Sequence, residues 1–139
     1  MISQGATVAM PCADCGALAL YHLAEHLVHG RVEWTLSIRC PACGNAIEED
    51  GWGTSPELIR DALVDEHGRF RIEVRSPSPS AAELMRVLRR ESPDMTLAEA
   101  KASAQRLRGG QVRGTRVEME QLAERLRAAG FIAEVEAMP

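Results

Sequence analysis

Two pairs of cysteines constrain the fold of this 139-residue chain more than any other feature of its sequence. Each pair has the form Cys-x-x-Cys followed by a glycine, and residues 16–39 separate the pairs. Two intervening residues let both thiolates of a pair reach one metal ion, and the glycine accepts the left-handed backbone that completes the turn. Four thiolates in a tetrahedron suit zinc. We therefore expect one zinc site with the ligands Cys12, Cys15, Cys40 and Cys43.

The cysteines have two other interpretations, a pair of disulfides or a redox Cys-x-x-Cys motif. A redox motif normally lies at the N-terminus of a helix that follows a strand, and neither pair has that setting. Because sulfur fills all four positions of the expected site, none remains for a catalytic water. The zinc is therefore expected to be structural.

The segment between the pairs predicts a β-hairpin. Apolar residues alternate with polar ones from Val32 to Arg39, which is the period of a strand. His29-Gly30 supplies a turn, and residues 18–28 form the partner strand, with a helix over the same residues as the alternative. The nearby histidines are expected on the surface rather than in a second metal site: His22, His26 and His29.

The order of cysteine turn, hairpin and cysteine turn resembles the zinc-ribbon family over about residues 8–53. The resemblance implies a small β domain, residues 1–53, that unfolds over residues 8–53 when zinc is removed. Zinc ribbons often serve as docking platforms for other proteins. We expect Trp52 to cover the small core, and the alternative is an exposed contact residue.

Residues 54–68 predict a linking helix. Ser55 is the expected N-cap, Pro56 the first helical residue, and His67-Gly68 the end. The apolar residues of the segment share one face of this helix, which we expect to pack on one or both neighbouring pieces. They are Leu58, Ile59, Ala62 and Leu63.

The remaining residues, 69–139, predict a second domain with the order β-α-α-β-α-β and a three-stranded sheet, so that the fold class is α+β. Strands are expected at 70–75, around Val112 and at 131–135, with a rigid turn at 76–80. Each of three helices begins with a capping box. The boxes are Ser80 with Glu83, Thr96 with Glu99, and Thr115 with Glu118. The side chains expected in the core are Leu84, Val87, Leu88, Leu97, Ala100, Ala104, Leu107, Met119, Leu122, Ala123, Leu126 and Ala129.

This second domain resembles the C-terminal domain of the bacterial ribosomal stalk protein over about residues 69–137. Leu97-Ala-Glu-Ala-Lys101 is similar to that family's helix-opening Leu-Lys-Glu-Ala-Lys. Leu126-Arg-Ala-Ala-Gly130 likewise precedes an acidic final strand. The resemblance implies docking of translational GTPases through the first two helices. By position it implies contacts from Arg86, Arg89 and Lys101, and we add the neighbouring Arg90.

The sequence also departs from that family. The link between the first two helices, residues 91–95, is bulkier and one residue longer than the family's glycine-rich link. The family's dimerising N-terminal domain is replaced by the cysteine-rich segment. The adaptor that delivers N-degron substrates to the Clp protease shares this fold, but its Asn-Asp-Asp motif would fall within residues 76–80 and is missing. N-degron binding is therefore not expected.

The charges of the two halves differ. Residues 1–68 carry three basic and ten acidic residues, a net charge of −7, whereas residues 69–139 carry thirteen and ten, a net charge of +3. We find no phosphate-binding glycine loop, catalytic triad, membrane span or secretory leader, which favours a cytoplasmic protein without enzymatic activity.

The expected function is a zinc-binding adaptor that docks a protein partner. Two alternatives remain open, a nucleic-acid or ribosome binder and a dedicated inhibitor or immunity protein for a single partner. The nucleic-acid alternative rests on arginines of the second domain, among which no aromatic residue is interleaved. These arginines are Arg86, Arg89, Arg90, Arg106, Arg108, Arg113 and Arg116.

Overall fold

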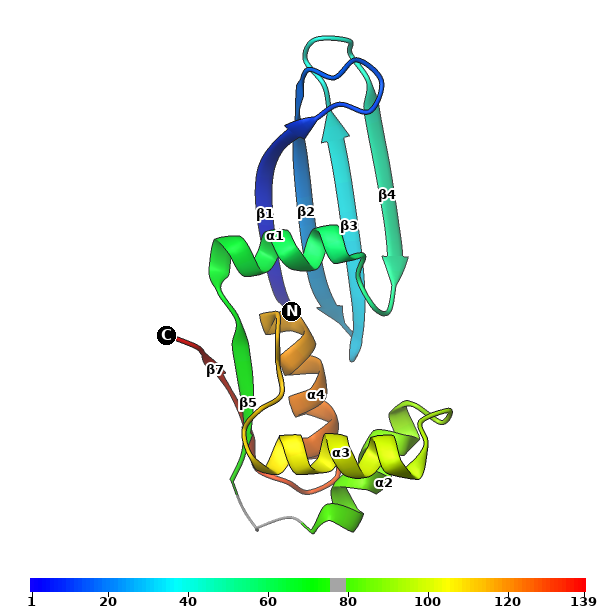
Figure 1. Ribbon diagram of the computed structural model, residues 1–139, viewed down its shortest axis with the longest axis vertical. Coiled ribbons are helices and arrows are strands. Elements are labelled where there is room, and N and C mark those ends of the chain that lie inside the picture. Colours follow the sequence, from blue (N-terminus) through cyan, green and yellow to red (C-terminus); the bar gives the residue numbers. More distant parts are fainter. Residues whose placement is uncertain (76–79) are drawn as a thin grey trace. The chain divides into compact units, whose positions relative to one another are not determined.

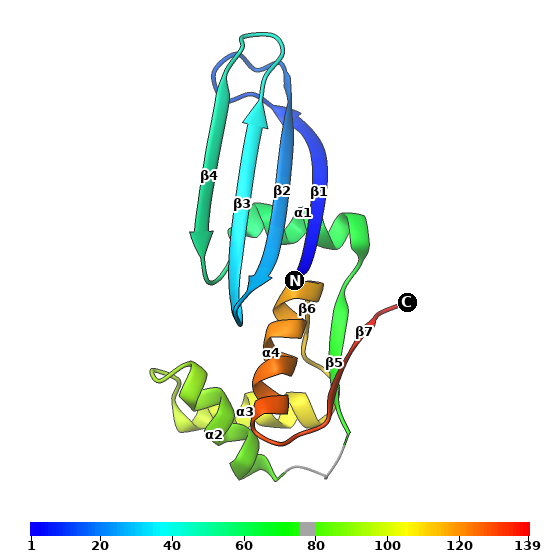
Figure 2. The same ribbon diagram turned by 180° about the vertical axis from the view of Figure 1, so that it is seen from behind.

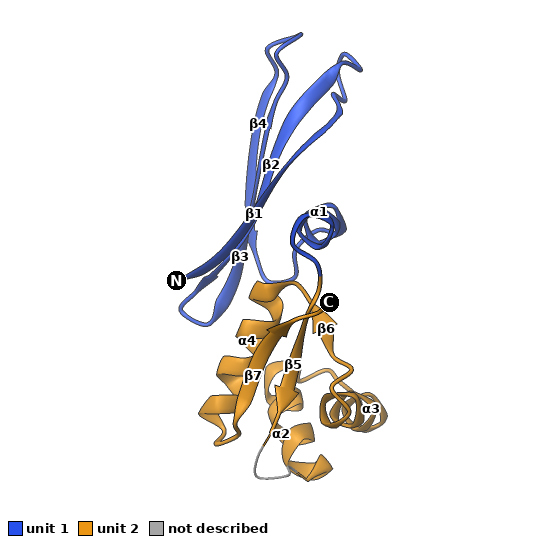
Figure 3. Cartoon of the chain, turned by 90° about the vertical axis from the view of Figure 1, so that its left-hand side faces the viewer, with its two compact units in different colours: residues 1–68 blue, residues 69–139 orange. Residues whose placement is uncertain are grey.

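The structure of the chain, a computed structural model, describes residues 1–75 and 80–139 (Figure 1). The fold is α+β. It divides into two compact units, Met1–Gly68 and Arg69–Pro139, which are coloured separately in Figure 3. The helix predicted at 54–68 lies in the first of these units.

The first unit contains a four-stranded antiparallel sheet. Its strands are β1 (Ile2–Pro11), β2 (Leu18–Val28), β3 (Arg31–Arg39) and β4 (Ala46–Trp52), paired in that order. The central hairpin forms as predicted, with Leu23 opposite Leu36 and a turn in which His29 has a φ of 50°. The helical alternative for residues 18–28 is therefore wrong. The two outer strands, β1 and β4, are additional to the prediction.

Helix α1 (Glu57–His67) crosses one face of this sheet, and within the unit the opposite face carries no helix (Figures 1 and 2). Its apolar side chains pack in one cluster with those of β2. Ile59 and Leu63 of the helix and Leu23 of the strand are almost completely buried there. The predicted apolar face of this helix thus forms the core of the first unit.

Two predictions around the start of α1 are wrong. The N-cap is Pro56 rather than Ser55, and the first helical residue is Glu57 rather than Pro56. The Ser55 side chain is buried and donates its hydrogen bond to the Glu25 carboxylate of β2. A carboxylate that is buried without hydrogen-bond donors costs much free energy, whereas water can satisfy the N–H groups at the start of a helix. The Ser55 hydroxyl therefore bonds to Glu25 instead of capping α1.

Trp52 does not cover the core. Side chains alternate between the faces of β4, and its neighbour Gly51 lies opposite Trp34, which packs on the core that α1 completes. Trp52 therefore points to the other face, where it is 47% exposed. The Arg31 guanidinium lies 4.6 Å from the centre of its ring, a cation–π contact.

The second unit contains a three-stranded antiparallel sheet in the order β6-β5-β7 and three helices. Along the chain the elements are β5 (Phe70–Val74), α2 (Ala81–Glu91), α3 (Leu97–Arg108), β6 (Arg113–Gly114), α4 (Arg116–Ala128) and β7 (Ala133–Ala137). One buried cluster joins the sheet to all three helices. It includes Ile72, Leu84, Leu107 and Leu126.

Two side chains that were expected in this core are exposed. Leu97 is the first residue of α3 and is 63% exposed, and Ala129 is the C-cap of α4. Both lie at helix ends, where periodicity alone does not say whether another element covers the side chain. Leu88 and Leu122 are half-buried. The turn predicted at 76–80 lies, apart from Ser80, outside the described residues.

All three predicted capping boxes are confirmed. In each one the hydroxyl of the N-cap accepts the N–H of the glutamate three residues later, and that glutamate accepts the N-cap N–H. In the second box the two distances are 3.1 and 3.2 Å. Hydrogen bonds from the Thr96 side chain and backbone lower the pKa of Glu99.

Replacing Thr96 by alanine is expected to raise the pKa of Glu99 and to cost about 1 kcal/mol of stability, as for other N-caps. Because folding lowers this pKa, the ionised Glu99 carboxylate stabilises the folded state at pH values above the pKa that Glu99 has in the unfolded chain. That contribution disappears as the pH falls through the folded pKa. NMR titration of the Glu99 carboxyl measures the shift, and Thr96→Ser, which keeps the hydroxyl, is the control. An unchanged pKa in Thr96→Ala would contradict this assignment.

Candidate functional site

The four cysteines lie in two connections at one end of the first sheet. Cys12 and Cys15 belong to the β1–β2 connection, and Cys40 and Cys43 to the β3–β4 connection. Both connections reach the same end because the four strands alternate in direction (Figure 1). Strand pairing thus brings together two pairs that are distant in sequence.

The two connections have matching backbone conformations. The N–H of the first cysteine bonds to the carbonyl five residues later, at 2.7 Å for Cys12 and 2.9 Å for Cys40. The N–H of the following glycine returns to the carbonyl of that first cysteine, at 2.9 Å in both turns. Gly16 and Gly44 both have a φ of 75°, the left-handed conformation that the sequence predicted.

The four Sγ atoms lie within 4.8 Å of one another, and none is in a disulfide. Two pairs across the turns are closer, at 3.8 Å for Cys12 and Cys43 and 3.5 Å for Cys15 and Cys40. Metal–sulfur bonds of about 2.3 Å in a tetrahedron place sulfurs about 3.8 Å apart. The cluster therefore has the dimensions of a metal site with four thiolate ligands.

The electrostatics of the cluster also fit a cation. A hydrogen bond from the Cys43 N–H lowers the pKa of the Cys40 thiol to about 7. The Asn45 N–H lowers the pKa of Cys43, but desolvation and hydrogen bonds with the other three thiols outweigh it and raise this pKa to about 12. Four adjacent thiols cannot all lose their protons, because the resulting thiolates repel one another. A bound divalent cation would offset this repulsion and allow all four to ionise.

A second candidate site lies between α2 and α3. It is a groove of about 570 Å³ with apolar side chains and three arginines around it. Its lining residues are Ala82, Met85, Arg86, Arg89, Arg90, Pro93 and Leu97. Among the residues that the structure describes, none of these three guanidiniums pairs with a carboxylate. The groove combines free cations with an exposed leucine.

The structure thus brings together three of the four residues that were expected to contact a partner. Lys101 does not line the groove, although it is exposed and lies one turn after Leu97 on α3. The apolar part of this site was not predicted from the sequence, because helical periodicity placed Leu97 in the core. The signal that was available is its position as the first residue of a helix, next to the polar link between α2 and α3.

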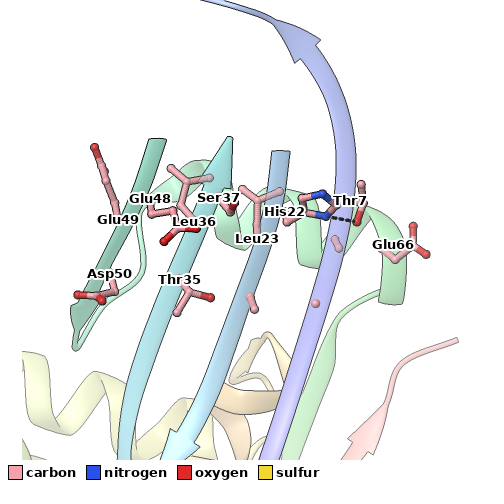
Figure 4. Close-up of a pocket in the computed structure, with 13 residues that line it drawn as sticks. Thr7, His22, Leu23, Thr35, Leu36, Ser37, Glu48, Glu49, Asp50 and Glu66 are labelled. Carbon is pink, nitrogen blue, oxygen red and sulfur yellow. Dashed lines mark hydrogen bonds between the residues drawn. The ribbon is translucent and has the colours of Figure 1, made fainter. Parts of the chain in front are cut away.

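A third feature is an open hollow of about 890 Å³ on the first sheet, lined from all four strands. Figure 4 shows the Thr7 hydroxyl and His22 Nδ1 joined by a hydrogen bond of 2.9 Å. On β4 the acidic residues Glu48, Glu49 and Asp50 are exposed. They are solvated side chains on an edge strand, where charge discourages pairing with other chains.

Comparison of the chain with protein-family models, curated proteins and solved structures found no match. Among the described helices, none combines the length and apolar character needed to cross a bilayer. The features of the chain that indicate a function are therefore the cysteine cluster and the α2–α3 groove.

Proposed function

We propose that this chain is a cytoplasmic, non-enzymatic adaptor that holds zinc at its four cysteines and docks a protein partner in the α2–α3 groove. Zinc is the metal that best suits four cysteine thiolates in a tetrahedron. Its role is structural, because sulfur occupies every coordination position. Cys12, Cys15, Cys40 and Cys43 hold the ion, and the ion ties the β1–β2 connection to the β3–β4 connection.

The observation that carries the docking proposal is the groove itself. Leu97 is 63% exposed and lines the groove together with the half-buried Met85, so an apolar side chain of a partner can bury itself against both. Arginine beside an apolar pocket is the composition of binding hot spots. The free guanidiniums favour a partner with acidic groups around an apolar side chain.

The resemblance of residues 69–139 to the ribosomal stalk C-terminal domain supports the same surface. That family docks translational GTPases through its first two helices, which correspond by position to α2 and α3. The order of strands and helices in this unit is compatible with the resemblance. We therefore propose translation factors as the first class of partner to test.

The test is a pull-down from cell lysate with the zinc-loaded full chain, read by mass spectrometry with and without nuclease. Reversing Arg86, Arg89 and Arg90 to glutamate should weaken capture of the partner at least tenfold, as for hot-spot residues. Stability should fall by no more than about 2 kcal/mol, because the side chains are on the surface but Arg89 and Arg90 lie in the last turn of α2, where the helix dipole favours a cation.

Leu97→Ser serves as the second variant because it changes the groove without changing the charge. Loss of the same protein from both variants supports docking in the groove. A partner that both variants retain would move the docking surface to the first unit. A partner that only the charge reversal loses would indicate general electrostatic attraction and contradict groove docking.

A further inference from the structure

Four further arginines follow one another along the connection from α3 through β6 into α4, and none of them lines the α2–α3 groove. We define this basic ridge as Arg106, Arg108, Arg113 and Arg116. All four residues are exposed. In the described parts of the chain, their guanidiniums pair with no carboxylate.

Other arginines of the same unit are paired. Arg71 binds Glu136 at 3.0 Å, and Arg125 binds Glu91 at 2.9 Å. Arg75 contacts three glutamates of β5 and β7, which raises its pKa. The unit thus neutralises its sheet and the end of α4 with its own carboxylates. It leaves the ridge positive.

Helix stability accounts for only part of the ridge. Arg106 and Arg108 occupy the last turn of α3, where a cation interacts favourably with the helix dipole. Arg116 is the first residue of α4, where the dipole disfavours a cation. A positive charge at that position is unfavourable for the isolated helix and favourable for binding an anion.

The ridge also offers room for an anion to approach the backbone. Arg108 lines a small hollow of about 250 Å³ together with Gly109 and Gly110, which have no side chains to block it. Glu73 also lines this hollow, but its carboxylate lies 3.5 Å from the Arg75 guanidinium. The acid that lines this hollow is therefore paired with another arginine, and no ion pair joins it to Arg108 among the described residues.

We propose that the basic ridge binds the phosphate backbone of a nucleic acid, as a function additional to protein docking. Guanidinium groups match phosphate oxygens with two parallel hydrogen bonds. No aromatic residue lies between 106 and 116, and Phe70, which pairs with Gly114 of β6, packs against the core, so the ridge offers no aromatic residue of its own for base stacking. Binding is therefore independent of sequence, and its affinity depends strongly on salt.

The experiment measures fluorescence anisotropy of a labelled mixed-sequence RNA of about 20 nucleotides with the zinc-loaded full chain, from about 50 to 200 mM salt. Four phosphate contacts predict that log K falls with log salt with a slope of about −3. The double variant Arg108→Gln, Arg113→Gln should lower the affinity at low salt and bring the slope to about −1.4.

The control is Arg31→Gln, Arg39→Gln in the first unit, which changes the net charge by the same amount. RNA binding that the ridge variant loses and the control retains supports the proposal. Absence of binding at low salt, or equal loss in both variants, would overturn it. Polyglutamate that competes as well as RNA would overturn it too, because the ridge would then be a surface for acidic proteins.

Discussion

Removing the metal from the full chain is expected to unfold residues 1–68 and to leave residues 69–139 folded. The β1–β2 and β3–β4 connections are joined at the cluster, where Cys12 and Cys40 are buried with the core of the first unit. Apart from the sulfurs, Asn45 of the β3–β4 connection donates a side-chain hydrogen bond of 2.8 Å to Asp14 of the β1–β2 connection. Structural zinc contributes about 10–16 kcal/mol of apparent binding energy in small domains, so the loss is large.

The distribution of tryptophans separates the two units in this experiment. Both tryptophans of the chain, Trp34 and Trp52, lie in the first unit, so their fluorescence reports on that unit alone. Of the four helices in the described residues, three lie in the second unit, so circular dichroism at helical wavelengths reports mainly on that unit. Chelation of the metal should change the tryptophan fluorescence and leave most of the helical circular dichroism signal unchanged.

The matched variant is Cys15→Ser, which removes one exposed ligand without disturbing the buried cysteines. It should reproduce the effect of chelation in the presence of zinc. Metal content measured on the same samples shows whether the ion has left. A first unit that keeps its melting temperature after confirmed metal loss would refute a stabilising role for the cluster.

Replacing Gly51 by alanine is expected to destabilise the first unit by about 1–3 kcal/mol, the usual cost of overpacking. A Cβ at this position would lie 2.5 Å from Cζ2 of Trp34, much closer than real contacts allow. The Trp34 ring is held between β4 and the core, so either the ring or the strand must move. Urea denaturation followed by tryptophan fluorescence measures the loss.

Gly5→Ala in β1 is the control for this substitution. A Cβ there meets the carbonyl oxygen of Leu23 at 3.6 Å, which is an ordinary contact. Both variants replace a strand glycine, so any general effect of alanine on the unfolded chain is shared. Equal unfolding midpoints for the two variants would show that the contact with Trp34 does not restrict this position.

Features that depend on neighbouring residues were predictable from the sequence. The capping boxes need only a hydroxyl and a glutamate three residues apart, and all three form. The cysteine turns are likewise local, since the Cys-x-x-Cys-Gly pattern determines the backbone of each turn. The central hairpin followed from strict alternation in β3 and from the turn at His29-Gly30.

Features that depend on distant residues were decided by the tertiary structure. The sequences of the outer strands do not clearly predict strands, because β1 consists mostly of small residues and β4 is acidic. Their pairing with the hairpin is therefore known only from the structure. Ser55 left its expected cap because Glu25 is buried beside it. Trp52 is exposed because it points to the face of the first sheet opposite Trp34, and Leu97 is exposed as the first residue of α3.

The same distinction holds for the candidate sites. The sequence by itself indicated the four cysteines of the candidate metal site, because each Cys-x-x-Cys pair is formed by its own turn. It also indicated the arginines of α2. Only the tertiary structure placed the two cysteine pairs together, put Leu97 beside those arginines, and separated the groove from the basic ridge. The physical reason is that a turn or a cap is stabilised by bonds between near neighbours, whereas a groove exists only where side chains from different elements leave a surface uncovered.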